Sequence, residues 1–279
     1  MIVGDFFMEL IVALVTPFRD GKIDYLSLEN LIKSLEKESD GLLILGSTGE
    51  AKLIEDIDKV EIVEFVRQKY KKKIIVGLEG RTIEEIVGLA KMLKHIEIDS
   101  YLISPISYIR PTKTGIINFY MELADRLDKP IILYEIPKRC GCHIGIEEIK
   151  ILKNHKKIIG IKNANPDSEY MIKLSQLSGD DFRIYTGDDI KILTGMLFKS
   201  FGLFSVMANK YPNVIRKIID DYPNCDEFLN YYDLFKITMS TSPLGIKYLL
   251  GNMEASRELG LLDRGTIDEI NNQIEKLNI

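Results

Sequence analysis

Residues 157–162 read KIIGIK, a short apolar run that ends in a lysine, and similar apolar runs recur along the whole chain. Unbroken apolar character rich in Ile and Val is typical of strands that are buried on both faces, as in a parallel sheet. The other runs are LIVALV (10–15), LLIL (42–45), KIIVGL (73–78), SYLIS (100–104), PIILYEI (130–136), FRIYTG (182–187) and GLFSVM (202–207).

Amphipathic segments separate these runs, for example residues 25–38 and 55–70, with apolar side chains on one helical face and charges on the other. Eight strand-like runs that alternate with helices predict an α/β protein of the (β/α)8 TIM-barrel type. A doubly wound open sheet is the competing fold, but no GxGxxG motif follows the first run. We expect the barrel to occupy residues 1–210.

The remaining residues, 211–279, are predicted to form a C-terminal helical extension. Three helical patterns lie there, at 226–239, 243–253 and 265–278. No linker rich in Pro, Gly and Ser separates this part from the barrel, so we expect it to pack on the barrel rather than to form a domain of its own.

Composition limits the classes of function. The chain has 279 residues and a net charge of −5, which argues against binding to nucleic acid or to an anionic membrane surface. The three cysteines, Cys140, Cys142 and Cys225, show no CxxC pattern, so neither a disulfide framework nor a structural zinc site is expected. Cys140 and Cys142 could form a redox pair or be two small residues of a tight loop. With no signal-peptide pattern and no apolar stretch near the ~18 residues of a membrane helix, a cytoplasmic location is predicted.

Lys162 ends its apolar run and is the first candidate for chemistry, since barrel active sites are built at the C-terminal ends of strands. Burial disfavours an ammonium and lowers its pKa, and a neutral amine can attack a ketone to form a Schiff base. Alternatively, the side chain could extend to solvent or pair with a carboxylate such as Glu135. Tyr134 lies at the end of the neighbouring predicted strand and could move the protons that imine formation requires.

Other polar residues follow the predicted strands. The turn GSTGE (46–50) offers Ser47, Thr48 and backbone N–H groups to a small carboxylate, although it could be an ordinary strand-to-helix turn. Arg139 is a candidate for bidentate binding of a second carboxylate, or a surface arginine. Asp188 could cap the following helix or, with Asp189, bind a cation, but no metal-ligand spacing or Ser-His-Asp arrangement emerges, and no metal site is predicted.

Several motifs together resemble the dihydrodipicolinate synthase/N-acetylneuraminate lyase superfamily over nearly the whole chain. They occur in the family's order and spacing: LIVALVTPF (10–18), GSTGE (46–50), YEIPKRCG (134–141), GIKNA (160–164), TGDD (186–189) and GLFSVMAN (202–209). The resemblance implies a (β/α)8 barrel with a C-terminal helical segment, assembled as a homotetramer, a dimer of dimers.

The resemblance also implies roles for single residues. Members of the family use or release pyruvate through a Schiff base on the lysine that is here Lys162, with Tyr134 as the proton shuttle. Ser47 would hold the keto-acid carboxylate, and Thr48 would belong to the proton relay. A second tyrosine would reach in from the partner subunit, and its place is taken here by Tyr108. The segment PISYIRP (105–111) around it departs from the family's usual double tyrosine. No cofactor is expected beyond the covalent imine.

Within the family, Arg139 stands where synthases that condense pyruvate with L-aspartate 4-semialdehyde, in lysine and diaminopimelate biosynthesis, bind the acceptor's carboxylate. A 2-keto-3-deoxygluconate-type sugar-acid aldolase that uses the same lysine is the alternative. Gly187 and Phe204 are assigned to the substrate-binding residues, and the apolar Phe204 disfavours the aldolase. The segments 51–56 and 77–85 lack the histidine and asparagine of lysine-inhibited synthases, so lysine feedback is not predicted.

Overall fold

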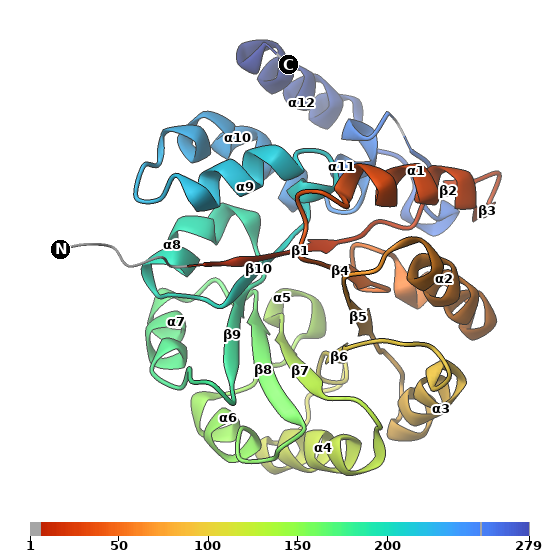
Figure 1. Ribbon diagram of the computed structural model, residues 1–279, viewed down its shortest axis with the longest axis vertical. Coiled ribbons are helices and arrows are strands. Elements are labelled where there is room, and N and C mark those ends of the chain that lie inside the picture. Colours follow the sequence, from red (N-terminus) through yellow and green to blue (C-terminus); the bar gives the residue numbers. More distant parts are fainter. Residues whose placement is uncertain (1–6, 252, 279) are drawn as a thin grey trace.

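The computed structural model describes residues 7–251 and 253–278, and in this part of the chain eight parallel strands close into a barrel (Figure 1). Around the barrel the strands follow the order β1-β10-β9-β8-β7-β6-β5-β4, so strands that succeed one another in sequence lie side by side. This confirms the predicted (β/α)8 fold and all eight predicted strands. Their bounds are β1 Glu9–Ala13, β4 Gly41–Ile44, β5 Lys73–Gly77, β6 Ser100–Ile103, β7 Ile131–Glu135, β8 Ile158–Asn163, β9 Arg183–Thr186 and β10 Gly202–Ser205.

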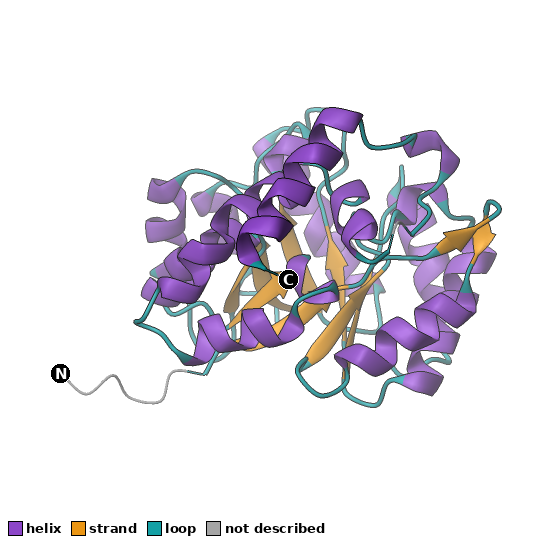
Figure 2. Ribbon diagram, turned by 90° about the horizontal axis from the view of Figure 1, so that it is seen from above, coloured by secondary structure: helices purple, strands orange, loops and turns teal. Residues whose placement is uncertain are grey.

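Helices surround the barrel on its outer side (Figures 1 and 2). Side-chain caps start several of them: Asp24, Thr82 and Thr112 each accept a hydrogen bond from a backbone N–H of the first turn. The helices between the strands are α1 Tyr25–Leu35, α2 Asp56–Lys69, α3 Ile83–Leu93, α4 Lys113–Arg126, α5 Pro137–Cys140, α6 Ile146–Leu152, α7 Ser168–Ser175 and α8 Ile192–Leu197.

The buried apolar side chains of the strands and of the surrounding helices form one hydrophobic core cluster. In β8, Ile158 and Ile161 are almost fully buried, as the unbroken apolar run predicts. In α2, the predicted apolar face of Val60, Ile62, Val63 and Val66 is buried as well. Each such side chain stabilises the fold by about 1.5–3 kcal/mol relative to exposure.

The part of the chain after residue 210 is helical and lies at the same end of the barrel as the predicted site. Helix α10 packs against α9, α11 and α12, and also against the turns that follow β9 and β10. It therefore lies against the turns at the C-terminal ends of β9 and β10. The four helices are α9 Pro212–Asp220, α10 Asp226–Ser240, α11 Leu244–Leu249 and α12 Arg264–Leu277.

One further element was not expected from the sequence. After β1, the strands β2 (Phe18–Arg19) and β3 (Lys22–Ile23) form a small antiparallel hairpin, which pairs with Glu254 near the C-terminus. Of the helices in the described part of the chain, none is long and apolar enough to cross a membrane.

Candidate active site

Lys162 and Tyr134 lie side by side at the C-terminal ends of two adjacent strands. They are register partners in the parallel pair of β8 and β7, so their side chains leave the sheet on the same face. The Nζ atom of Lys162 lies 4.2 Å from the centroid of the Tyr134 ring. The predicted proximity of these two residues is thus present in the structure.

The Lys162 amine is deeply buried, with only 4% of the residue exposed. Within the described residues, its Nζ makes no hydrogen bond or ion pair; its neighbours are the rings of Tyr134 and, at 5.1 Å, Phe204. Burial lowers the pKa of Lys162 to about 7, the Arg139 charge acts in the same direction, and Asp189 and Asp188 oppose it. A large share of this amine is therefore unprotonated at neutral pH and can act as a nucleophile.

Glu135 is not the partner of Lys162, so the ion-pair alternative is wrong. Its fully buried carboxylate accepts hydrogen bonds from the backbone N–H of Ile144 at 2.8 Å and from Nδ2 of Asn165 at 2.9 Å, and it pairs with Nδ1 of His143. The reason is the alternation of a strand: Tyr134 shares the inner face with Lys162, and the next residue points to the other side. This pairing raises the pKa of His143.

A cavity of about 530 Å³, here called the inner cavity, opens in front of Lys162. Tyr134, Ser47 and Thr48 line it, so the structure brings the predicted hydroxyl groups to the predicted amine. Burial raises the pKa of Tyr134 to about 12, while a hydrogen bond with the Ser47 side chain acts in the opposite direction. Tyr134 is consequently protonated at neutral pH and able to donate a proton.

Gly187 and Phe204 shape the space around the lysine. A Cβ atom at Gly187 would lie 2.9 Å from Cε of Lys162, so a larger residue here would require the lysine side chain to shift. Gly187 also lines the inner cavity. Phe204 is fully buried and packs against Lys162. It therefore forms an apolar surface beside the amine; it lines neither the inner cavity nor the side cavity, and its contact with a substrate stays a prediction.

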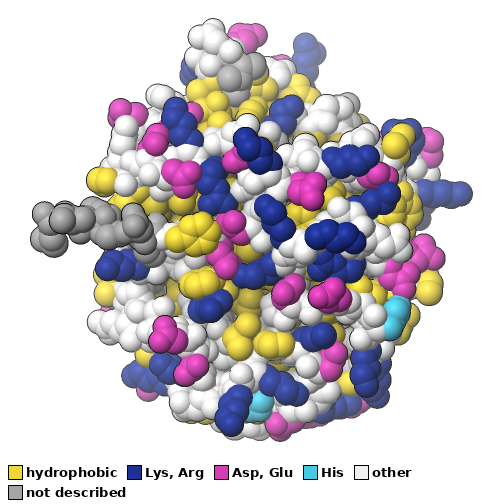
Figure 3. All heavy atoms as spheres, viewed as in Figure 1, with side chains coloured by type: hydrophobic (Ala, Val, Ile, Leu, Met, Phe, Trp, Pro, Cys, Tyr) yellow, Lys and Arg dark blue, Asp and Glu magenta, His cyan; other side chains and the backbone are white. Residues whose placement is uncertain are grey.

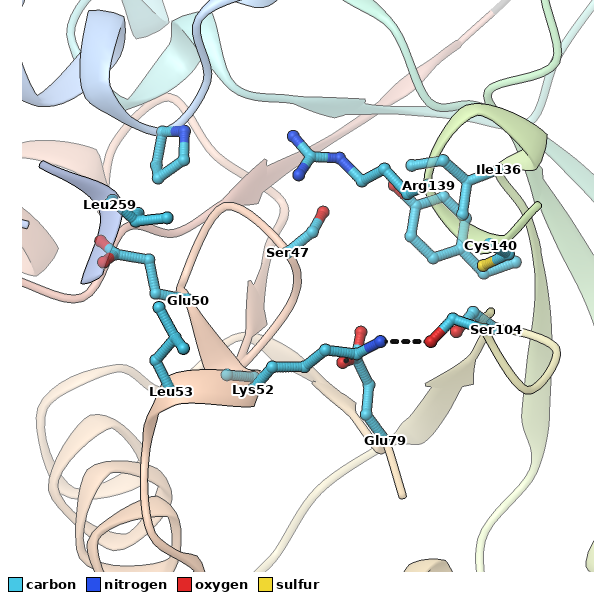
Figure 4. A pocket seen from close by; sticks show the side chains of 14 residues that line it. Ser47, Glu50, Lys52, Leu53, Glu79, Ser104, Ile136, Arg139, Cys140 and Leu259 are labelled. Atoms are coloured by element: carbon cyan, nitrogen blue, oxygen red, sulfur yellow. Dashed lines mark hydrogen bonds and ion pairs between the residues drawn. The ribbon is translucent and has the colours of Figure 1, made fainter. Parts of the chain in front are cut away.

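Arg139, on the short helix α5, lines the inner cavity and also a second, adjacent space. Its Nη2 donates a hydrogen bond to the backbone oxygen of Ser242 at 3.1 Å. The second space, here called the side cavity, has a volume of about 380 Å³ and shares Ser47, Tyr134 and Ile136 with the inner cavity. Figure 4 shows the side cavity, with Lys52 and Glu79 on the side opposite Arg139.

The two aspartates after β9 accept hydrogen bonds from backbone N–H groups of the turns around the site. Asp188 caps the turn at Asp189–Lys191 by accepting from the N–H of Ile190, which confirms the capping interpretation. The buried Asp189 accepts hydrogen bonds from Ser205 and from the backbone N–H groups of Val206 and Met207. Asp189 thus fixes the segment after β10, a role that the sequence analysis missed.

Tyr108 does not reach either cavity of its own chain. The residue is 98% exposed and has a positive φ of 74°, while its backbone N–H donates to the oxygen of Cys140. Its loop nevertheless borders the site, because Ser104 and Ser107 line the side cavity. A tyrosine held outward in this way is available to a second molecule.

The C-terminal helical part supplies residues that no motif indicated. Its contributions to the inner cavity are Lys236, Met239, Ser240 and Ser242. These residues lie far along the chain from Lys162 and reach the site only because α10 packs over the strand ends. Nothing in their local sequence distinguishes them from the other residues of an amphipathic helix.

Charges on the face of the molecule shown in Figure 3 are mixed, with Lys and Arg interspersed among Asp and Glu. Among residues 7–251 and 253–278, no group of three or more His, Cys, Asp and Glu side chains is arranged to hold a metal ion. Cys140, Cys142 and Cys225 are free thiols, and Cys140 is the buried last residue of α5.

Comparison with known proteins gives consistent results. The model of the Dihydrodipicolinate synthetase family matches residues 6–256. The 4-hydroxy-tetrahydrodipicolinate synthase of Aquifex aeolicus (strain VF5) is 30% identical over 278 residues, which cover 94% of each chain. The crystal structure of dihydrodipicolinate synthase from Aquifex aeolicus superposes with a TM-score of 0.90, 27% identity and 98% coverage of both chains. A dihydrodipicolinate synthase from Acinetobacter baumannii, solved in complex with pyruvate, has a TM-score of 0.90 at 25% identity and covers 98% of this chain and 99% of its own.

Proposed function

Since this chain belongs to the dihydrodipicolinate synthetase family, we propose that it condenses pyruvate with L-aspartate 4-semialdehyde to give 4-hydroxy-tetrahydrodipicolinate, through a Schiff base on Lys162. The family makes the chain an enzyme, a lyase. The observation that carries the proposal is the buried amine of Lys162, whose pKa is about 7, beside the protonated Tyr134. A relative solved with pyruvate supports the choice of the keto acid.

The first half of the proposed reaction forms the imine. The neutral amine of Lys162 attacks C2 of pyruvate, and the resulting carbinolamine loses water with a proton supplied by Tyr134. Ser47, Thr48 and the N–H groups of their turn hold the pyruvate carboxylate. Loss of a proton from C3 then gives an enamine, a carbon nucleophile.

The second half forms the new carbon–carbon bond. The enamine attacks the aldehyde carbon of the acceptor, and the alkoxide that develops takes a proton. Arg139, at the boundary between the two cavities, binds the acceptor's carboxylate. The acceptor's amine, once deprotonated, then adds to C2 and expels Lys162, which closes the ring. These steps need no cofactor.

Replacing Arg139 by alanine tests the assignment of the acceptor. We expect the KM for aspartate semialdehyde to rise by about 10- to 100-fold, because a charge-assisted bidentate contact is lost. The pyruvate adduct on Lys162 should still form. Because the Arg139 charge helps to lower the pKa of Lys162, its removal raises that pKa, so adduct formation is to be compared at several pH values up to about 9.

Two further variants serve as controls for this experiment. Arg139→Lys keeps the charge without the planar fork and should give an intermediate KM. Arg257→Ala removes an exposed arginine that pairs with the adjacent Glu258 and should leave both KM values unchanged. Acceptor kinetics that survive Arg139→Ala would show that the synthase assignment is wrong.

The proposal extends to the assembly. We propose a homotetramer, a dimer of dimers, in which Tyr108 of one chain reaches the site of another. The outward position of Tyr108, on a loop that borders the side cavity, supports this arrangement. A cytoplasmic location fits the proposed substrates, which are small metabolites.

A further inference from the structure

One carboxylate at the side cavity has no role in the steps above. Glu79 follows the end of β5, next to the strand β4 that leads into the Ser47–Thr48 turn. Its Oε2 is buried and has no hydrogen-bond partner among the described residues. A buried carboxylate oxygen that accepts no hydrogen bond is costly, and at an active site it indicates a group that accepts one when a ligand is present.

Lys52 forms an ion pair with this oxygen but does not donate a hydrogen bond to it. Nζ of Lys52 lies 3.8 Å from Oε2 of Glu79, which is too long for a hydrogen bond, and instead donates to Oγ of Ser107 at 2.6 Å. Lys52 and Glu79 come from the same side of the cavity, and Arg139 and Ser47 lie across from them (Figure 4). Space for a ligand therefore remains between Glu79 and Arg139.

The charges around this space are close enough to interact. Burial raises the pKa of Glu79, whereas Lys52, Lys59 and Arg139 lower it. The Glu79 charge in turn contributes to raising the pKa of Tyr134. The side cavity is thus lined by Tyr134, the proposed proton donor, with the Arg139 cation on one side and the Glu79 carboxylate on the other. A ligand with an adjacent carboxylate and ammonium, as in an α-amino acid, matches this pattern.

We propose that Glu79 binds the α-ammonium group of the acceptor while Arg139 binds its α-carboxylate, so that the pair selects an α-amino-acid aldehyde over an aldehyde that carries a carboxylate alone. The inference rests on the proposed function and adds a specificity-determining residue to it. It also explains how the site would disfavour acceptors such as glyceraldehyde, which offer neither a cation to Glu79 nor a carboxylate to Arg139.

Two acceptors that differ only in the amino group test the inference. Aspartate semialdehyde carries the ammonium, and succinic semialdehyde lacks it. With the full-length protein, pyruvate consumption is measured with each acceptor for the unaltered chain and for Glu79→Gln. We expect Glu79→Gln to lower kcat/KM for aspartate semialdehyde by about 10- to 100-fold and to leave kcat/KM for succinic semialdehyde unchanged. The KM for pyruvate should not move.

Controls distinguish a specific loss of acceptor selectivity from a general loss of folding. Borohydride trapping of the pyruvate adduct shows whether Glu79→Gln keeps an intact site. If it does not, Glu79→Asp, which keeps the charge on a shorter side chain, takes its place with the same expected change in selectivity. Glu85→Gln alters an exposed glutamate nearby that is bonded to Arg81, and should behave as the unaltered chain.

The outcomes are distinct. An equal loss with both acceptors, or no loss with either, would overturn the role of Glu79 and leave the proposed function standing. Failure of the unaltered chain to consume pyruvate with aspartate semialdehyde would overturn the proposed function and this inference together.

Discussion

Lys162→Ala is expected to abolish the pyruvate adduct and to lower kcat/KM by about 10⁴-fold or more, because it removes the buried amine that we propose as the nucleophile. The adduct is measured by treating the protein with pyruvate and borohydride, which reduces the imine to a stable secondary amine. Mass spectrometry of the intact chain and of its peptides then locates the added group.

The control for this experiment is another lysine. Lys150 is exposed on α6 and pairs with Glu147, so Lys150→Ala should keep both the adduct and the activity. A reduced adduct that persists in Lys162→Ala, or that maps to a different lysine in the unaltered chain, would contradict the assignment of the nucleophile.

The second large effect concerns stability. Lys247 of α11 and Glu50 are each only 1% exposed and form an ion pair. Glu50 also accepts hydrogen bonds from the N–H and Oγ of Ser256, and Lys247 donates to the backbone oxygen of Glu254. Replacing Lys247 by methionine leaves a buried carboxylate without its cation, so we expect the free energy of unfolding in urea to fall by about 3–5 kcal/mol.

A double variant separates the ion pair from simple packing. Lys247→Met combined with Glu50→Gln removes both charges and should lose less stability than Lys247→Met alone, because no uncompensated charge remains buried. Arg81→Ala, at an exposed pair with Glu85, should change the free energy of unfolding by less than about 1 kcal/mol. If Lys247→Met alone is as stable as the double variant, the buried charge of Glu50 is not the cause of the lost stability.

This ion pair connects the two parts of the chain at the site. Glu50 directly follows Gly49 of the turn that carries Ser47 and Thr48, and has a positive φ of 58°. Its side chain is tied to α11 and to the segment after it. The C-terminal helices therefore support the turn that we propose to hold the pyruvate carboxylate.

The barrel could be predicted because each of its strands and helices is marked by a pattern within its own segment of the sequence. Each apolar run marks a strand buried on both faces, and the even alternation with amphipathic helices leaves few other topologies. The positions of Lys162 and Tyr134 follow from the same logic: both end their runs, and sequential strands of a barrel are neighbours. The Ser47–Thr48 turn and Arg139 could be found because motifs of the chain resemble a known family.

The remaining features depend on contacts between distant segments. The orientation of Glu135 required the register of β7, which sends Tyr134 inward and Glu135 to the opposite face. The hydrogen bonds of Asp189 to the segment after β10 and the ion pair of Glu50 with Lys247 join residues whose local sequence gives no reason for their contact. The burial of the Glu79 oxygen without a hydrogen-bond partner likewise depends on segments that are distant in the sequence.

The most direct test of the account offers the protein pyruvate together with either aspartate semialdehyde or glyceraldehyde and follows pyruvate consumption, with Lys162→Ala as the blank. We predict turnover with aspartate semialdehyde and none above the blank with glyceraldehyde, since only the former supplies groups for both Arg139 and Glu79. Turnover with glyceraldehyde alone would contradict the account and make the protein a sugar-acid aldolase that uses the same lysine.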